Sequence, residues 1–274
     1  MDGFIGLHET YVGDWAVAAP RSLRARLYRA LDLVARRAAD CYLIDTEQRA
    51  DEVRRDATTP VLALEVGAPA WARPSKTARE LDRQDDPLRV LYYGNYIPLH
   101  GIDSVIDALA AVRGRRAVTA TCLGDGAARP AVERRVQALG LDDVVTFTGP
   151  VAERDLARVI HDHDIVLGVF GTSSKAGGVV ANKVWQGLAC GRTVITRDAA
   201  ALNPIADTVG SALIRVPAGD PRALADAIVA SCASRSTNDH DDVASRLEAL
   251  VQRSFVAFGD WLLRTEPTQT GTTR

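Results

Sequence analysis

The stretch Leu91-Tyr-Tyr-Gly-Asn-Tyr-Ile-Pro-Leu-His-Gly101 decides the fold class of this chain. It closes a short apolar run, residues 89–93, and leads into residues 102–112, where apolar side chains recur at helical spacing. A short apolar strand followed at once by an amphipathic helix is half of a βαβ unit, from which parallel sheets are built. The stretch therefore predicts an α/β fold.

The same alternation continues toward the C-terminus. Apolar runs predict further strands at residues 118–123, 144–147, 165–170, 193–196 and 212–216. Helices are expected between and after them, at residues 130–139, 152–161, 182–189, 200–207 and 221–231. The run 165–170 is apolar throughout, which is typical of a strand at the centre of a parallel sheet. Strands joined in series by helical crossovers predict a doubly wound, Rossmann-like parallel sheet.

The residues before this domain form a different pattern. Residues 21–39 predict an amphipathic helix, residues 41–44 and 61–66 predict two strands, and residues 68–86 have the Pro, Arg and Asp content of a linker. Two or three strands cannot close a domain alone. We therefore expect residues 1–85 to form an incomplete N-terminal α/β segment.

Length and composition exclude several classes of protein. The chain has 274 residues, of which 47% are hydrophobic and 25% charged. It contains no run of about 20 apolar residues that would span a membrane. Its net charge of −2 lacks the basic field on which non-specific nucleic-acid binding depends. We expect neither an integral membrane segment nor a nucleic-acid partner.

The cysteines and the first residues bear on the cellular compartment. Four cysteines are too far apart for a zinc cluster or a redox pair: Cys41, Cys122, Cys190 and Cys232. We expect them to be reduced core residues. Residues 1–9 have neither the basic nor the apolar part of a signal peptide. Both features predict a cytoplasmic protein.

Three glycine-bounded loops follow predicted strands, at residues 94–101, 124–126 and 171–178. In doubly wound sheets, ligands bind beyond the carboxyl ends of the strands, where helix N-termini can hold phosphate. Each loop alone is a weak signal, because glycines at strand ends more often serve backbone geometry. For Gly124-Asp125-Gly126 alone we favour that structural explanation.

In order and contents, these segments resemble the C-terminal nucleotide-sugar domain of GT-B glycosyltransferases, specifically the family 4 or group 1 type. The segments that match the family's motifs are residues 91–101, 123–126, 139–149, 186–196 and 216–225. The resemblance implies a retaining transferase that uses a nucleotide-diphosphate sugar as substrate and needs no metal ion or other cofactor. We expect a lipid-linked molecule or a glycan as its acceptor.

The resemblance also predicts how the chain is divided. A complete N-terminal domain of the family is larger than residues 1–85, which we interpret as a remnant of the acceptor domain plus a linker. Residues 86–235 are expected to be the nucleotide-sugar domain and residues 236–264 a C-terminal helix that crosses back to the first segment. The polar residues 265–274 are expected to be disordered.

Four positions depart from the family's pattern. Asn95 and His100 stand where the family carries the arginine and lysine that hold the donor diphosphate. Gly178 and Gln186 stand where it carries two glutamates, the second of which binds the nucleotide ribose. Hydrogen bonds between neutral groups contribute about 0.5–1.5 kcal/mol, against about 1.5–3 kcal/mol when one group is charged. The donor site is therefore expected to be modified or lost.

Lysine is rare in this chain, and two of the three lysines, Lys175 and Lys183, lie close together in the sequence. Cations near a positive helix end stabilise the charge that develops on a departing nucleoside diphosphate. We assign Lys175 and Lys183 as catalytic candidates; the alternative is that both are solvated surface residues. The donor-binding candidates are Gly94, Asn95, His100, Gly124, Asp125, Gly126, Ser173, Ser174, Asn182 and Gln186.

The histidines leave alternatives open. His100 either titrates near neutral pH and pairs with phosphate, or caps the following helix. His161 and His163 flank Asp162, and because no further metal ligand is in sight we interpret this run as a solvated helix end without metal.

Two amphipathic helices carry apolar stripes, the first over residues 21–39. Its basic residues are Arg21, Arg24, Arg26, Arg29, Arg36 and Arg37, and its apolar stripe is Leu23, Leu27, Leu31 and Val34. It either contacts an anionic membrane peripherally or packs its stripe against the protein, and packing is favoured. Packing is also favoured for the C-terminal stripe, which comprises Phe255, Phe258, Trp261 and Leu262.

A glycosyltransferase is thus the first functional hypothesis. A catalytically impaired nucleotide-sugar-binding module is the alternative, because the family's two glutamates are replaced and the N-terminal segment is expected to be an incomplete domain. A GT-B sugar epimerase ranks last, because its carboxylate-dependent chemistry is hard to place here.

Overall fold

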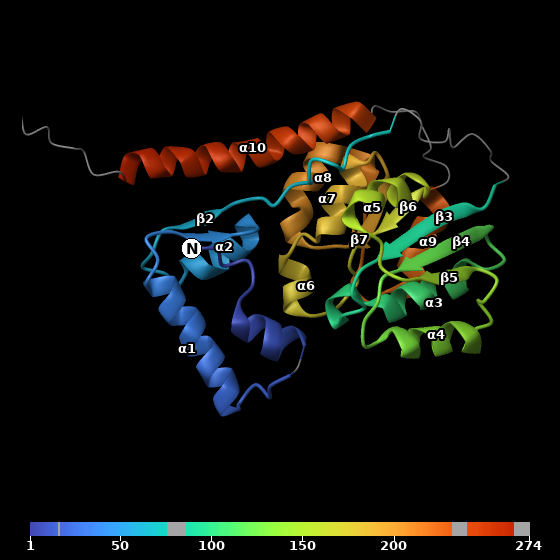
Figure 1. Cartoon of the computed structure of the whole chain (residues 1–274), viewed down its shortest axis with the longest axis horizontal. Coiled ribbons are helices and arrows are strands. Elements are labelled where there is room, and N and C mark those ends of the chain that lie inside the picture. The colour runs from blue at the N-terminus through green and yellow to red at the C-terminus, as the bar shows by residue number, and fades with distance from the viewer. Residues whose placement is uncertain (16, 76–85, 232–239, 266–274) are drawn as a thin grey trace, which may run out of the picture.

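The computed structural model describes residues 1–15, 17–75, 86–231 and 240–265, except the side chains of residues 14, 240 and 241. Figure 1 shows a sheet domain and a smaller N-terminal segment, with the long helix α10 (His240–Thr265) running along both. All but the first residue of the expected disordered tail, much of the expected linker and Cys232 lie outside the described residues. That first residue, Thr265, is the last residue of α10. The other three cysteines are buried and free, as expected.

A six-stranded parallel sheet with the order β5-β4-β3-β6-β7-β8 organises the larger part, which confirms the doubly wound fold. Its strands are β3 (Leu88–Tyr93), β4 (Val118–Leu123), β5 (Val145–Thr148), β6 (Ile165–Leu167), β7 (Thr193–Arg197) and β8 (Leu213–Val216). The chain order reverses between β3 and β6, where Val90 pairs with Ile165. Ligands bind at such a switch point in open α/β sheets, since the helices that follow the two strands pack on opposite faces of the sheet.

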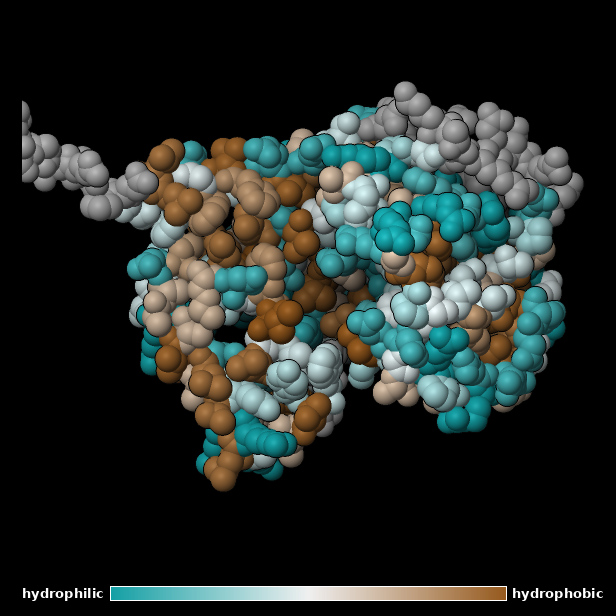
Figure 2. Space-filling view, viewed as in Figure 1, coloured by the Kyte–Doolittle hydropathy of each residue, from teal (hydrophilic) through white to brown (hydrophobic). Residues whose placement is uncertain are grey.

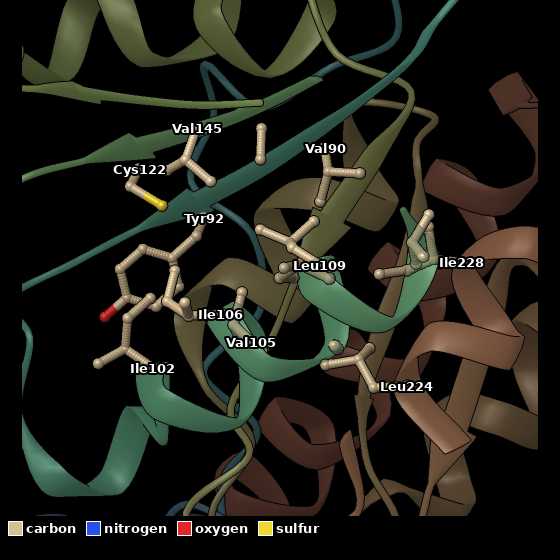
Figure 3. Close-up of a cluster of buried hydrophobic side chains, with 14 of the residues drawn as sticks. Val90, Tyr92, Ile102, Val105, Ile106, Leu109, Cys122, Val145, Leu224 and Ile228 are labelled. Atoms are coloured by element: carbon tan, nitrogen blue, oxygen red, sulfur yellow. The ribbon is translucent and has the colours of Figure 1, made fainter. Parts of the chain in front are cut away.

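Helices cover both faces of the sheet, because alternate residues of each central strand point to opposite sides. One face packs Val90 and Tyr92 against α3 (Ile102–Val112), α4 (Arg129–Ala138) and α9 (Pro221–Ala230). Figure 3 shows this core, with Ile106 and Leu109 of α3 beside Val90 and Tyr92. The other face packs Leu91 and Tyr93 against α5 (Glu153–His161), α7 (Asn182–Ala189), α8 (Asn203–Val209) and the start of α10.

Two elements after β3 differ from the sequence-based expectation. Strand β6 ends at Leu167, three residues early, because the backbone amides of Phe170 and Gly171 bond to the carbonyls of His100 and Leu99 instead of to a neighbouring strand. The expected loop at residues 171–178 contains a short helix, α6 (Ser174–Gly178), capped by the Ser173 side chain. The two loops at the switch point are therefore hydrogen-bonded to each other.

The N-terminal segment has its own small parallel sheet, β1 (Tyr42–Ile44) and β2 (Val61–Ala63). Between them lies α2 (Glu47–Arg54), which is an addition to the expected elements and is capped by Thr46. Helix α1 (Leu23–Arg37) precedes β1, and a π-helical stretch, η1 (Glu9–Asp14), precedes α1. Among the described residues, no helix combines the length and apolarity needed to cross a bilayer.

The expected packing of the two apolar stripes is wrong for α1 and only partly right for α10. Helix α1 packs through Ala25 and Tyr28, which contact Val12 and Ala18, and this contact turns Leu23 and the rest of its stripe outward. In the C-terminal stripe on α10, Phe255 and Leu262 are exposed, whereas Phe258 and Trp261 are partly buried and stack on each other. The later half of α10 does reach the N-terminal segment, since the Glu65 amide donates a hydrogen bond to Ser254 Oγ.

Candidate functional site

The last two residues of β3, Tyr92 and Tyr93, point to opposite faces of the sheet. Tyr92 points toward α3, and its hydroxyl lies 3.1 Å from His100 Nδ1. Tyr93 points toward α7, and its hydroxyl donates a hydrogen bond of 2.7 Å to Gln186 Oε1. The strand end thereby contacts two of the expected donor-binding residues, one on each face of the sheet, at the switch point. The tyrosines were not among the expected site residues, since in sequence they resemble any apolar strand.

Lys183 lies in the first turn of α7, and only 5% of its surface is exposed. Its Nζ atom lies 4.7 Å from the centre of the Tyr92 ring and 5.6 Å from that of Tyr93. Within the described residues it has no hydrogen-bond partner. Burial lowers the pKa of Lys183 to about 7. Buried polar groups are normally hydrogen-bonded, so a free buried amine at a helix N-terminus is suited to an anionic ligand.

His100 adopts neither of the two expected roles. Burial, and secondly the charge of Lys183, lower the pKa of His100 to about 3, so the imidazole is neutral at neutral pH. No side chain caps α3, whose N-cap is Gly101. The ring instead contacts Tyr92 and lies beside Lys183, where a neutral imidazole acts as a hydrogen-bonding group.

Gly94 makes room for both of these side chains. Its φ of 146° lies in a region that L side chains rarely adopt, and an added Cβ would lie 2.4 Å from His100 Cε1 and 3.3 Å from Lys183 Nζ. Only glycine therefore lets the strand end pass between the histidine and the lysine. Asn95 follows it and is exposed, as is Asn182 at the start of α7.

The glycines of the β4–α4 loop serve close backbone approach, in agreement with the structural explanation. A Cβ at Gly124 would lie 2.1 Å from the carbonyl oxygen of Gly94, and one at Gly126 would lie 2.0 Å from that of Asn95. The exposed Asp125 accepts a hydrogen bond from the Gly126 amide. The β4–α4 loop therefore packs directly against the backbone of the loop after β3.

Lys175 makes different contacts from Lys183. It lies in α6, and its Nζ atom donates a 2.8 Å hydrogen bond to Thr10 Oγ1 in the N-terminal segment. Ser173 Oγ accepts from the Ala176 amide, whereas Ser174 is exposed. Arg197, a residue that sequence reasoning missed, donates to the carbonyl of Gly171 at 2.6 Å and so holds the start of this loop.

Arg49 occupies the space beside Gly178. A Cβ at Gly178 would lie 3.1 Å from Arg49 Cγ, so the arginine stem stands where a side chain at position 178 would go. The guanidinium pairs with Asp45 at 2.5 Å and with Glu9 at 2.7 Å. Burial raises the pKa of Asp45, although Arg49 opposes this shift. Thr46 Oγ1 donates to the Gly178 carbonyl at 2.8 Å, which ties the N-terminal segment to α6.

The run around Asp162 is not a simple solvated helix end. His163 is half-buried, and its Nε2 atom lies 2.8 Å from Thr121 Oγ1 of β4. His161 Nε2 lies 2.9 Å from the carbonyl oxygen of Arg73. Among the residues whose placement is described, no three His, Cys, Asp or Glu side chains gather as a metal centre would require.

Comparison with known proteins gives one family. Residues 87–234 match the profile of the family described as "Glycosyl transferases group 1". A D-inositol 3-phosphate glycosyltransferase of Mycobacterium marinum is 34% identical over 149 residues, which are 54% of this chain and 30% of that protein. The chain thus spans less than a third of the length of this curated relative.

Solved GT-B glycosyltransferases share the fold. Sucrose-phosphate synthase from Thermosynechococcus elongatus superposes with a TM-score of 0.71 at 21% identity, over 96% of this chain and 66% of that one. HepE of Anabaena in complex with UDP-glucose gives a TM-score of 0.65 at 17% identity, over 86% of this chain and 68% of that one. The six-stranded sheet therefore corresponds to a GT-B nucleotide-sugar domain in fold.

Proposed function

Since the chain belongs to the group 1 glycosyltransferases, we propose that it transfers a sugar from a nucleotide-diphosphate-sugar donor with retention of configuration. The observation that carries the proposal is Lys183, a buried amine without a hydrogen-bond partner among the described residues, at the β3–β6 switch point. Residues 86–235 bind the donor in this proposal, and residues 1–85 belong to the acceptor side.

Lys183 holds the donor diphosphate in the proposed reaction. The bond between the anomeric carbon and the diphosphate oxygen breaks, and its electron pair leaves with the nucleoside diphosphate. The acceptor hydroxyl forms the new bond on the same face of the sugar, and its proton passes to the departing diphosphate oxygen. A diphosphate beside Lys183 favours the ammonium form, and the N-terminus of α7 adds its partial positive charge. The ammonium group and the helix N-terminus together stabilise the negative charge on the departing nucleoside diphosphate, and the proposed reaction needs no metal ion.

Neutral residues complete the proposed site. Gln186 accepts from Tyr93 through its carbonyl oxygen, and in the proposal its amide nitrogen donates to the nucleotide. Gly94 allows phosphate to approach the strand end closely. His100 and Asn95 supply hydrogen bonds where the family carries cations. The acceptor is a lipid-linked or glycan hydroxyl. The three cysteines that the structure describes are free, which suits a cytoplasmic reaction.

A turnover assay tests the proposal. The purified chain is incubated with a panel of nucleotide sugars, beginning with UDP-glucose because HepE was crystallised with it. Acceptors include inositol phosphates, glycans and lipid-linked sugars, and NMR reads the anomeric configuration of the product. We expect product with the donor's configuration from the wild type and little from Lys183→Ala. An inverted product, or equal activity of the variant, would contradict the mechanism.

A nucleotide-sugar-binding module without catalysis is the second candidate, and Arg49 favours it. The arginine stem stands beside position 178, where the resembled family carries a carboxylate. Donor binding without turnover by the full chain, across the whole panel, would select the module over the transferase.

A further inference from the structure

The apolar stripe of α1 faces away from the protein. The exposed fractions are 81% for Leu23, 55% for Leu27, 45% for Leu31 and 64% for Val34. Spacings of three and four residues place these side chains on one face of the helix. The opposite face holds Ala25, which is 1% exposed. In Figure 2 the region of α1 is mainly hydrophobic, and Figure 1 shows the helix at the edge of the molecule.

Arginines border this stripe on both sides. At about 100° per residue, Arg24 lies along one border and Arg26 and Arg37 lie along the other. All three are exposed, and none forms an ion pair with a described residue. The acidic residue of α1, Asp32, turns inward, where its carboxylate accepts hydrogen bonds from the amides of Leu7 and His8. The outward face is therefore both apolar and cationic.

Trp15 lies in the segment that packs against the buried side of α1. Its ring packs against Tyr11, whose ring centre lies 5.4 Å from that of Tyr28 on α1. Trp15 and Val17 are both exposed. Tryptophan is favoured where a membrane meets water, because one part of its ring is apolar and its N–H is polar.

We propose that α1 binds the surface of an anionic lipid membrane, with its stripe among the acyl chains and its arginines at the phosphate groups. A lipid surface offers negative charge along both borders of the helix at once. A second copy of the chain would instead place arginines of one α1 against those of the other, and like charges disfavour that contact. Charge complementarity therefore selects the lipid surface.

Vesicle co-sedimentation tests the proposal independently of sugar transfer. The probes are vesicles of phosphatidylcholine alone and of phosphatidylcholine mixed with phosphatidylglycerol. The wild type should bind the mixed vesicles, and salt should weaken the binding, because the charges are exposed. Each arginine near an anionic surface contributes about fivefold, so R24Q/R26Q/R37Q should bind about a hundredfold more weakly. Leu27→Glu should also abolish binding, since it places a charge within the stripe.

A matched control variant loses the same number of positive charges, but from the sheet domain instead of from α1. R134Q/R154Q/R222Q removes three exposed arginines of the sheet domain and should bind as the wild type does. Circular dichroism checks that every variant is folded. The proposal is overturned if the wild type does not bind the mixed vesicles, or if both triple variants lose binding equally. It is also overturned if sedimentation shows a dimer that Leu27→Glu dissociates, because the stripe then joins two copies.

Discussion

Replacing Lys183 with methionine is expected to stabilise the protein while removing its diphosphate site. Methionine keeps most of the side chain's apolar volume beside Tyr92 and Tyr93 and lacks the amine. Burial lowers the pKa of Lys183 from 10.5 to about 7. At about 1.4 kcal/mol per pH unit, this shift costs the folded state about 5 kcal/mol when the unfolded chain is protonated.

The direction in which the wild type's stability changes with pH, and the pH range of that change, follow from proton binding. Between about pH 7 and pH 10.5 the unfolded chain holds the proton and the folded chain does not, so stability of the wild type rises with pH. Below about pH 7 both states are protonated and the full cost is present. Contact with the two tyrosine rings returns about 1–2 kcal/mol to the ammonium form. Lys183→Met should therefore gain about 3 kcal/mol at pH 7 and less than about 1 kcal/mol at pH 10.

Urea unfolding at a series of pH values, followed by circular dichroism, measures this difference. Lys183→Gln is the matched control: it is also uncharged, so it should lose the same pH dependence, but it keeps a buried polar group and should gain less stability. A difference between Lys183→Met and the wild type that does not vary from pH 7 to pH 10 would refute the reasoning. It would mean that the amine is solvated or paired in solution.

Three further outcomes are expected. Lys183→Ala should weaken binding of UDP by about 10- to 100-fold, the equivalent of about 1.5–3 kcal/mol, and leave binding of uridine nearly unchanged; calorimetric titration with both ligands decides, and equal small effects would remove Lys183 from the diphosphate site. Arg49→Ala leaves two partner carboxylates without their buried cation and should cost about 3 kcal/mol of unfolding free energy, measured in urea; a neutral effect would show that the pair is not buried in solution. Hydrogen exchange should be fast over residues 4–66 and slow over residues 90–195, because β1 and β2 form only a two-stranded sheet; equal protection would mean that the N-terminal segment is stable in its own right.

The sequence alone was sufficient to predict the strands and helices of the sheet domain. Its strands and helices follow from local periodicity, and glycines such as Gly94 and Gly124 mark strand ends whose backbone needs a positive φ. The order of these segments also predicted the family. These features depend on residues close together in the chain, so no long-range contact is needed to read them. The short helices α2 and α6 were missed, because one turn or two carry little periodicity.

Tertiary structure alone decided the character of the candidate site. Lys183 has a lowered pKa because it is buried, beside the rings of Tyr92 and Tyr93, and it has no hydrogen-bond partner among the described residues; no spacing in the sequence reveals either property. Arg49 reaches Gly178 across more than a hundred residues of chain, since Thr46 and Gly178, which are 132 residues apart, are hydrogen-bonded. Periodicity likewise showed that α1 is amphipathic, but it did not show which face of the helix is exposed to solvent. Desolvation and side-chain contact are properties of neighbours in space, and the chain brings these neighbours together only on folding.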